Sequence, residues 1–363
     1  MRNNLAIPHS GYHWNQLASS YFEGWYLRVT LPELGETFAF MYSIENPLGK
    51  DSYYGGAIQI LGIDEQYLCR TIPNIDRFWA SNNDFSFCHW HKLNNPKTKL
   101  PASLLTSEEF IHNILEGYQV TPTLNQGSVY NPQTNNYYRW NYQIKPLYGW
   151  GNPQSSQQAT AGWLSYLPLF DPGWQVTMAH GLATGWIEWH NQTYHFQDAP
   201  AYSEKNWGTA FPKKWFWLNC NSFDNAQNLA LTAAGGIRQV LRTQETVGLV
   251  GIHYQDKFYE FVPWNSQISW RIQPWGSWQV SAVNHQNYQV TLSGNTDLTG
   301  TYVRTPTKEG LALNCRDTTK GTLHLKLQHG AKTIVVASSK LAGLEIGGTP
   351  WDRDWVVESS SIH

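Results

Sequence analysis

Short runs of alternating hydrophobic and polar residues recur along the whole chain, and Gly, Pro, Asn and Asp separate them. In the run at 257–264, Phe258, Glu260 and Val262 fall on one face of an extended chain, and the residues between them fall on the other. Runs of this kind, bounded by turn-forming residues, predict β-strands. Other examples are FAFMYSIE (38–45), YYRWNYQI (137–144), WQVTMAHGL (174–182), KWFWLNC (214–220) and LHLKLQH (323–329).

Helical periodicity is scarce by comparison, and only 100–116 and 236–245 carry a weak 3.6-residue repeat. Many strands with little helix are typical of antiparallel barrels or sandwiches. A chain of 363 residues needs about two such units, and the Pro-rich stretch 197–214 is the expected junction. We therefore predict an all-β protein with one antiparallel β-barrel domain over 1–197 and another over 198–363.

Composition excludes some classes of partner and leaves others open. The formal net charge is −2 and only 14% of residues are charged, so no basic field is available to hold a nucleic acid. Aromatic residues are abundant, with 19 Trp, 20 Tyr and 14 Phe. Such residues pack well in sheets, but they also line cavities for apolar, ring-bearing or sugar ligands. The sequence leaves both interpretations open.

Metal and cofactor signals are weak. Two histidine pairs, in PHSGYH (8–13) and CHWH (88–91), have spacings that zinc tolerates, but neither has the second half of a known zinc pattern. No GxSxG, HExxH, GxGxxG or Walker motif is present. We expect no metal and no cofactor. The four cysteines form no CxxC pair, so we expect reduced thiols at Cys69, Cys88, Cys220 and Cys315.

The N-terminal sequence does not read as a signal peptide, and no run approaches the roughly 18 apolar residues of a membrane span. We therefore expect a protein without a transmembrane segment, either cytoplasmic or peripheral on a membrane from which it draws lipid. The sequence carries no prediction of oligomeric state.

Three segments combine polar and aromatic residues beyond what sheet building needs. The first joins PHSGYHW (8–14) to FEGWYLR (22–28), where Glu23 is either an exposed edge charge or a buried carboxyl with a raised pKa. The second joins GWIEW (185–189) to QDAPAYSEKNWG (197–208), which is either a solvated turn between domains or a wall of a cavity between two barrels. The third, EIGGTPWDRDW (345–355), is most simply a tight turn with surface charge.

These segments resemble tocopherol cyclase, a plant and cyanobacterial family of vitamin E synthesis. The resemblance extends from about residue 8 to residue 352, and its most specific part is the block around SEKNWG (203–208). The other matching segments are PHSGYHW, FEGWY, FMYSIENP, LYGWG, GWIEW, FPKKWFW, HYQDKFYEFVPWN, CRDT and LEIGGTPW.

The resemblance implies that both barrels are lipocalin-like. Without the transit extension and long C-terminal tail of plant members, the chain is expected to be a cyanobacterial member, and any membrane contact would be with the thylakoid. A more distant likeness is to lipocalin-like proteins that include carotenoid hydratases, which carry two adjacent Trp where this chain has Gly24 and Trp25. Their catalytic details are therefore not transferred.

The reaction that the resemblance implies is closure of a chromanol ring. The substrates would be prenylated benzoquinols such as methyl-phytyl-benzoquinol and dimethyl-phytyl-benzoquinol, whose phenol oxygen adds across the nearest double bond of the prenyl tail. The difficult step delivers a proton to an alkene carbon, which requires an acid that stays protonated at neutral pH. A buried carboxyl meets this demand because desolvation disfavours its charged form. Aromatic faces stabilise the developing cation and exclude water.

Candidate residues follow from the segments that carry the resemblance. The proton donor is predicted to be Glu204 or Asp198, with Glu23 third. Lys205 or His9 is expected to orient the quinol oxygens or accept the phenolic proton. The residues expected to bind the substrate are Tyr12, Trp25, Tyr26, Trp189, Tyr202, Asn206 and Trp207.

Two other functions remain as alternatives. A non-catalytic lipocalin-like carrier of prenyl quinols would share the fold and the apolar cavity, although a carrier gains nothing from buried carboxyls. A glycan-binding or glycan-cleaving protein is supported by aromatic content and scattered carboxylates alone.

Overall fold

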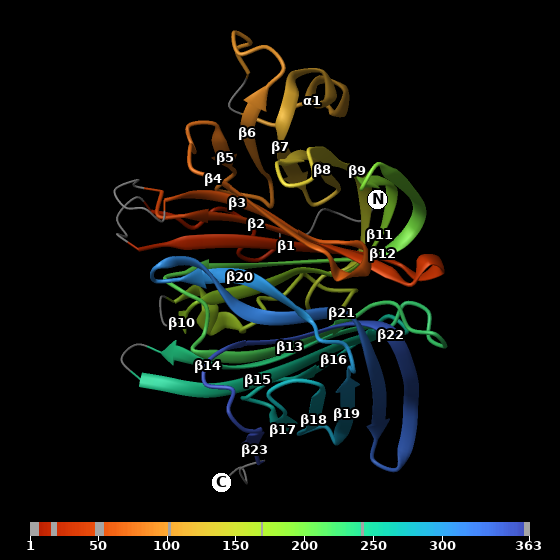
Figure 1. The fold of residues 1–363 in the computed structure, drawn as a ribbon. Coiled ribbons are helices and arrows are strands. Elements are labelled where there is room, and N and C mark those ends of the chain that lie inside the picture. Colours follow the sequence, from red (N-terminus) through yellow and green to blue (C-terminus); the bar gives the residue numbers. More distant parts are fainter. Residues whose placement is uncertain are drawn as a thin grey trace.

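The computed structural model describes residues 7–15, 20–47, 54–100, 103–167, 170–240 and 243–358. Within these ranges the regular structure is almost entirely antiparallel strand, arranged as two sheets that lie one above the other (Figure 1). Each sheet curls around its own hydrophobic core as a half-barrel. The prediction of an all-β fold with two antiparallel units and little helix is confirmed.

The first sheet has eleven strands in the order β4-β3-β2-β1-β12-β11-β9-β8-β7-β6-β5. Their bounds are β1 Phe22–Leu31, β2 Glu36–Glu45, β3 Gly55–Leu61, β4 Tyr67–Ile72, β5 Phe78–Ala80, β6 Phe87–Leu93, β7 Ile114–Thr121, β8 Leu124–Asn131, β9 Asn136–Tyr148, β11 Gly173–Trp189 and β12 Gln192–Gly208.

The second sheet has twelve strands, ten of them in the order β16-β15-β14-β13-β22-β21-β19-β18-β17-β23, while β10 pairs with β14 and β20 with β21. Their bounds are β10 Phe170–Asp171, β13 Lys214–Cys220, β14 Ala230–Val240, β15 Thr243–Tyr254, β16 Lys257–Phe261, β17 Ser266–Ile272, β18 Ser277–Asn284, β19 Tyr288–Asn295, β20 Thr301–Thr307, β21 Gly310–His329, β22 Lys332–Gly348 and β23 Trp355–Val357.

Helical structure in the described residues is short. The α-helix α1 (Ser107–Asn113) lies inside the predicted segment 100–116 and begins with a capping box between Thr106 and Glu109. Three 3₁₀ turns are η1 (Pro32–Leu34), η2 (Ile63–Glu65) and η3 (Trp163–Tyr166). The helix predicted at 236–245 is wrong, because its described residues belong to β14 and β15. Alternation in β14, where Leu231 and Ala233 enter the core, outweighs the weak helical repeat.

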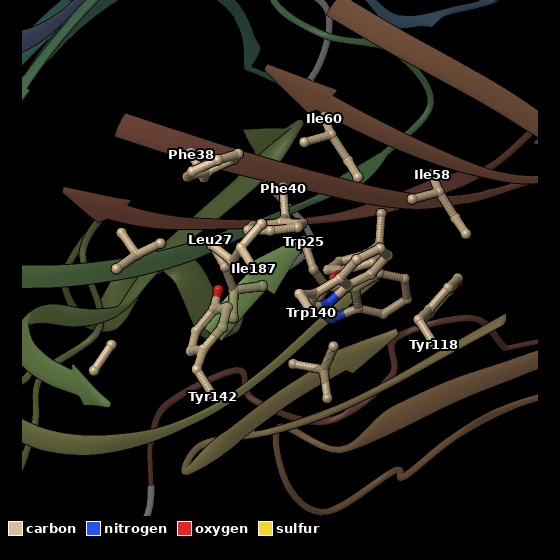
Figure 2. Packing of buried hydrophobic residues seen from close by; sticks show 14 of the residues in the cluster. Trp25, Leu27, Phe38, Phe40, Ile58, Ile60, Tyr118, Trp140, Tyr142 and Ile187 are labelled. Carbon is tan, nitrogen blue, oxygen red and sulfur yellow. The ribbon is translucent and has the colours of Figure 1, made fainter. Parts of the chain in front are cut away.

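Two hydrophobic cores lie inside the half-barrels, and a third apolar layer lies between the sheets. The first-sheet core surrounds Trp25, Phe40 and Trp140 (Figure 2). The second-sheet core surrounds residues such as Phe216 and Trp278. The layer between the sheets, the intersheet cluster, consists of Tyr148, Trp150, Val176, Ala179, Tyr202 and Trp217.

Strand β13 is hydrophobic on both faces because each face packs against a different apolar layer. Phe216 and Leu218 pack into the second-sheet core, whereas Trp217 on the opposite face packs in the intersheet cluster. Every residue of β13 is buried, as expected for a strand covered on both sides. The junction predicted at 197–214 contains the end of β12 and the 209–213 linker to β13. The domain boundary after residue 197 stays a prediction.

Candidate active site

Two rows of cross-strand neighbours face each other where the sheets meet. Residues that are directly opposite in a ladder project from the same face of a sheet. In the first sheet such neighbours on β12, β1, β2 and β3 form a row of Glu204, Tyr26, Met41 and Gln59. In the second sheet neighbours on β14, β13, β22 and β21 form a row of Ala234, Trp217, Glu345 and Asp317. All eight residues line one cavity of about 560 Å³.

Small residues beside these rows leave the space open. Gly24 and Ser43 pair across β1 and β2, and Gly236 follows Ala234 on the same face of β14. A Cβ atom added at Gly24 or Gly236 would meet no neighbour closer than 3.5 Å. The cavity therefore exists because side chains are absent from both walls at this level. On one side β20 covers it, where the Arg304 N–H donates to Gln59 Oε1 at 3.3 Å.

Glu204 is the carboxyl of the first-sheet row. The Tyr202 hydroxyl donates a hydrogen bond to Glu204 Oε2 at 2.6 Å, and Trp217 Nε1 donates to the same oxygen at 3.2 Å. Burial raises the pKa of Glu204 to about 7, and these donors, with Trp174, offset only part of that effect. At neutral pH, a carboxyl with this pKa keeps its proton in a large fraction of the molecules.

Asp317 and Glu345 form a carboxyl pair in the second-sheet row. They are direct neighbours on β21 and β22, both line the cavity and both are buried. Trp215 Nε1 donates to the Glu345 carboxyl, whereas Asp317 Oδ1 has no hydrogen-bond partner among the described residues. Burial, followed by the charge of Glu345, raises the pKa of Asp317 well above its usual value, and burial raises the pKa of Glu345.

Neither member of this pair is among the catalytic residues predicted from the sequence. Asp317 lies in the CRDT segment and Glu345 in LEIGGTPW, and both segments carry the family resemblance. The signal that was available is that Glu345 interrupts the apolar run AGLEIG (342–347), whereas Asp317 stands among polar residues in NCRDTTK (314–320). Nothing in the sequence indicated that β21 and β22 bring the two carboxyls together.

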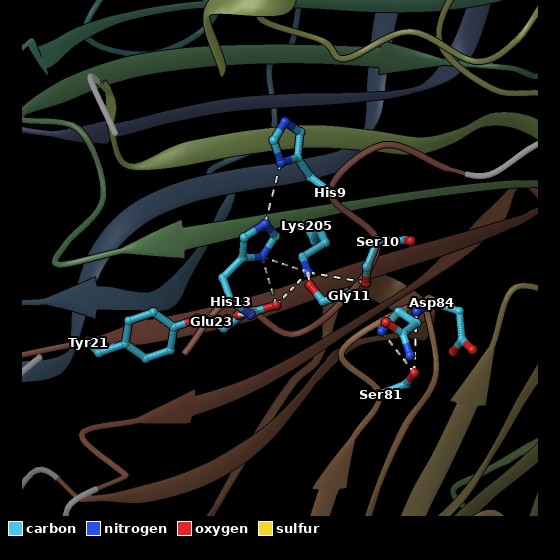
Figure 3. A network of polar contacts seen from close by, with 10 residues as sticks. His9, Ser10, Gly11, His13, Tyr21, Glu23, Ser81, Asp84 and Lys205 are labelled. Carbon is cyan, nitrogen blue, oxygen red and sulfur yellow. Dashed lines mark hydrogen bonds and ion pairs between the residues drawn. The ribbon is translucent and has the colours of Figure 1, made fainter. Parts of the chain in front are cut away.

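Glu23 is an ion-paired carboxylate. Its Oε1 lies 2.5 Å from Lys205 Nζ, and both side chains are fully buried (Figure 3). The His13 backbone N–H donates to Glu23 Oε2 at 2.9 Å, and the Tyr21 hydroxyl donates to the same oxygen. Burial acts to raise the pKa of Glu23, but the Lys205 charge and the bonds from His13 hold it below its usual value. Lys205 also donates to the Gly11 carbonyl at 2.7 Å.

Two histidines of the N-terminal segment line the cavity near this pair. The His13 ring stacks on Trp207 with ring centroids 4.0 Å apart. His9 Nε2 lies 2.9 Å from Ser165 Oγ, and its Nδ1 lies 3.5 Å from His13 Nε2. Burial lowers the pKa of His9 to about 4, so its imidazole is neutral at pH 7. A neutral imidazole is able to donate or accept a hydrogen bond to a quinol oxygen.

The structure brings half of the predicted site residues together on the wall of the cavity. The cavity is lined by Glu204, His9, Trp25, Tyr26, Asn206 and Trp207.

The other predicted residues lie elsewhere. Tyr202 belongs to the intersheet cluster and contacts Glu204, whereas Lys205 is buried on the other face of β12, in contact with Glu23. Trp189 belongs to the first-sheet core, and Tyr12 packs against that core. Asp198 is exposed beside an irregular part of β12, and its backbone N–H donates to Thr184 Oγ1 at 3.1 Å.

No helix among the described residues is long and apolar enough to cross a membrane. In the same ranges, no three His, Cys, Asp or Glu side chains converge in a way that could hold a metal ion.

Comparisons with known proteins assign the family. The model of the tocopherol cyclase-like family matches residues 19–348. A probable chloroplastic tocopherol cyclase of Oryza sativa subsp. japonica is 43% identical over 97% of this chain and 80% of its own length. A chloroplastic tocopherol cyclase of Zea mays is 42% identical over the same shares of the two chains.

Solved structures of similar shape include kievitone hydratase from Nectria haematococca, with 10% identity, a TM-score of 0.46, and coverage of 97% of this chain and 96% of that one. A putative AttH from Nitrosomonas europaea has 11% identity and a TM-score of 0.46, covering 94% and 98% of the two chains. The match to the family model across most of the chain, with the two plant relatives, identifies this protein as a member of the tocopherol cyclase-like family.

Proposed function

We propose that this chain closes the chromanol ring of prenylated benzoquinols in the cavity between the two sheets, with Glu204 as the proton donor. The observation that carries the proposal is a buried carboxyl with a pKa of about 7 on the wall of an aromatic cavity. A general acid is most effective when its pKa lies near the working pH, because it is then both protonated and able to release its proton.

The reaction needs few groups beyond an acid and a dry cavity. The tail carbon nearer to the ring takes the proton, and positive charge develops on the next, tertiary carbon. The phenol oxygen then bonds to that carbon. Tyr26, Trp217 and Trp174 surround Glu204, and an aromatic face is worth about 1–2 kcal/mol to a desolvated cation. The same rings keep out water, which would otherwise trap the cation as an alcohol.

The test is the variant Glu204→Gln. It keeps the shape of the side chain and can still accept the bonds from Tyr202 and Trp217, so the fold should persist. With methyl-phytyl-benzoquinol under reducing conditions, kcat for chromanol should fall by about 10²–10⁴, the usual contribution of a general acid. In the wild type the rate should decline as pH rises through about 7, because Glu204 then loses its proton.

Glu188→Gln is the matched control, since Glu188 lies on β11 of the same sheet, far from the carboxyl rows and paired with Arg139. Its kcat should equal that of the wild type. A Glu204→Gln protein with near wild-type kcat would remove the assignment. A wild-type protein that binds the quinol and forms no chromanol would instead support a carrier.

We also propose that the protein takes its lipid substrate from a membrane surface through the rim of the cavity. Tyr166 and Trp264 line the cavity and are 63% and 52% exposed, and Trp163 beside them is 72% exposed. Such amphipathic rings suit the interface between lipid and water. Replacing the three by Ser should reduce co-sedimentation with phospholipid vesicles. Ile111→Ser, on α1 and also exposed, should leave it unchanged.

A further inference from the structure

Asp317 and Glu345 place two carboxyl groups side by side in a cavity that already contains Glu204. Adjacent carboxyls in a dry site do not both ionise readily, so such a pair gives up its second proton with much more difficulty than its first. It therefore holds one negative charge over a wide pH range. The oxygen Asp317 Oδ1, which has no hydrogen-bond partner among the described residues, is available to a ligand.

The charged groups around the pair favour this single charge. Arg28 on β1 adds a positive charge nearby, although its guanidinium bonds to Asn219 and to the Leu341 carbonyl. Glu65 on η2 opposes a second negative charge and is held by the Thr319 N–H at 2.7 Å.

Other titratable groups that face the pair are Cys315 on β21, Tyr26 on β1 and Glu204 on β12. Burial raises the pKa of both Cys315 and Tyr26, so neither competes for the charge at neutral pH. The charge of Glu345 in turn contributes to the raised pKa of Glu204. A negative pair on one wall thus helps the acid on the other wall to keep its proton.

We propose that the Asp317–Glu345 pair is the base of the cyclisation, which accepts the phenolic proton as the ring closes. This inference rests on the proposed function. In the step, the Glu204 O–H bond breaks and a C–H bond forms with the alkene electron pair. A lone pair of the phenol oxygen forms the C–O bond, and the phenolic proton moves to a carboxylate oxygen of the pair. Glu204 ends ionised and the pair neutral, so the total charge is unchanged. After product release, proton exchange with water restores the protonated Glu204 and the negative charge of the pair.

The test compares Asp317→Asn, Glu345→Gln and the double variant. Each single variant keeps one carboxylate and should lose less than about tenfold in kcat. The double variant should lose about 10²-fold or more, with KM nearly unchanged. The residual rate of the double variant should no longer fall at acidic pH, because the base is gone. It should still fall at alkaline pH, because Glu204 then loses its proton. A double variant with wild-type kcat, or with the acidic fall intact, would overturn the inference.

Deuterium exchange gives a second readout, which a merely structural role would not change. In D₂O the double variant should place deuterium in the tail of recovered quinol, because Glu204 still protonates the alkene while ring closure stalls. Glu204→Gln should show no such exchange. Absence of exchange in a folded double variant that has lost turnover would also count against the pair as the base.

Controls separate a failed inference from a failed function. Glu45→Gln removes another buried carboxyl, outside the cavity, and should keep wild-type kcat. If the double variant does not fold, Asp317→Asn with Glu345→Met replaces it, because apolar replacement of buried charge is often neutral. If the wild type forms no chromanol, the proposed function fails. If the wild type forms chromanol and the double variant matches it, the role of the pair alone fails.

Discussion

The buried Glu23–Lys205 ion pair should be essential for stability, and Glu23→Gln tests this. Both side chains are fully buried and their charged atoms lie 2.5 Å apart. In the variant, Lys205 keeps only uncharged partners, the nearest being the Gly11 carbonyl at 2.7 Å. Removing one partner of a buried pair costs about 3–5 kcal/mol, because the remaining charge stays desolvated. We expect the free energy of unfolding in urea to fall by this amount.

The expected magnitude depends on burial, and two comparisons check that reasoning. Arg139–Glu188 is a partly exposed pair, so Glu188→Gln should cost no more than about 1 kcal/mol. Glu23→Gln combined with Lys205→Met removes both charges and should be less destabilising than Glu23→Gln alone. If Glu23→Gln costs no more than Glu188→Gln, the assignment of a buried, ionised pair is wrong.

The pH dependence of this pair has a definite sign. The pKa of Glu23 is lower in the folded protein than in the unfolded chain, where it is about 4.3. Its contribution to stability is therefore complete above that value and is lost as pH falls through the lower folded pKa. Urea unfolding between pH 7 and pH 3 should show a steeper loss of stability for the wild type than for the double variant.

The remaining predictions concern the cavity and the acid. Gly236→Val should fill the cavity and reduce chromanol formation at least tenfold while the thermal unfolding midpoint stays near that of the wild type. In contrast, Gly235→Val should unfold the protein more easily, because a Cβ there would lie 2.3 Å from the Phe216 ring. Equal unfolding midpoints for the two variants would contradict the assigned faces of β14. Trp217→Phe removes a donor to Glu204, so the alkaline fall in kcat should move to higher pH, and an unchanged profile would exclude this contact.

The strands could be predicted from the sequence because alternation of hydrophobic and polar residues is a local pattern. Glu204 became a candidate through the family resemblance of the block around SEKNWG, and its role stays a prediction. What the sequence did not reveal is register. Asp317 and Glu345 become neighbours only through the long β21–β22 hairpin, whose pairing shifts at several points.

Strand register also explains why the three carboxylates predicted as proton donors have different surroundings. Glu204, Glu23 and Asp198 all lie on strands with aromatic neighbours, yet one is buried without an ion-pair partner, one pairs with Lys205 and one is exposed. Lys205 reaches Glu23 because β1 and β12 pair so that Trp25 lies opposite Lys205. Such cross-strand relations decide whether a carboxyl is neutral or ionised, and local sequence does not encode them directly.

Because the cavity lies between the two sheets, its carboxyl groups come from both halves of the protein. Glu204 belongs to one half-barrel, and Asp317 and Glu345 belong to the other. A fragment that contains a single sheet would therefore possess either the proposed proton donor or the proposed acceptor, but never both. Relative sliding of the two halves would change the separation between these groups, so the linker at 209–213 and the intersheet cluster act together to keep the chemistry intact.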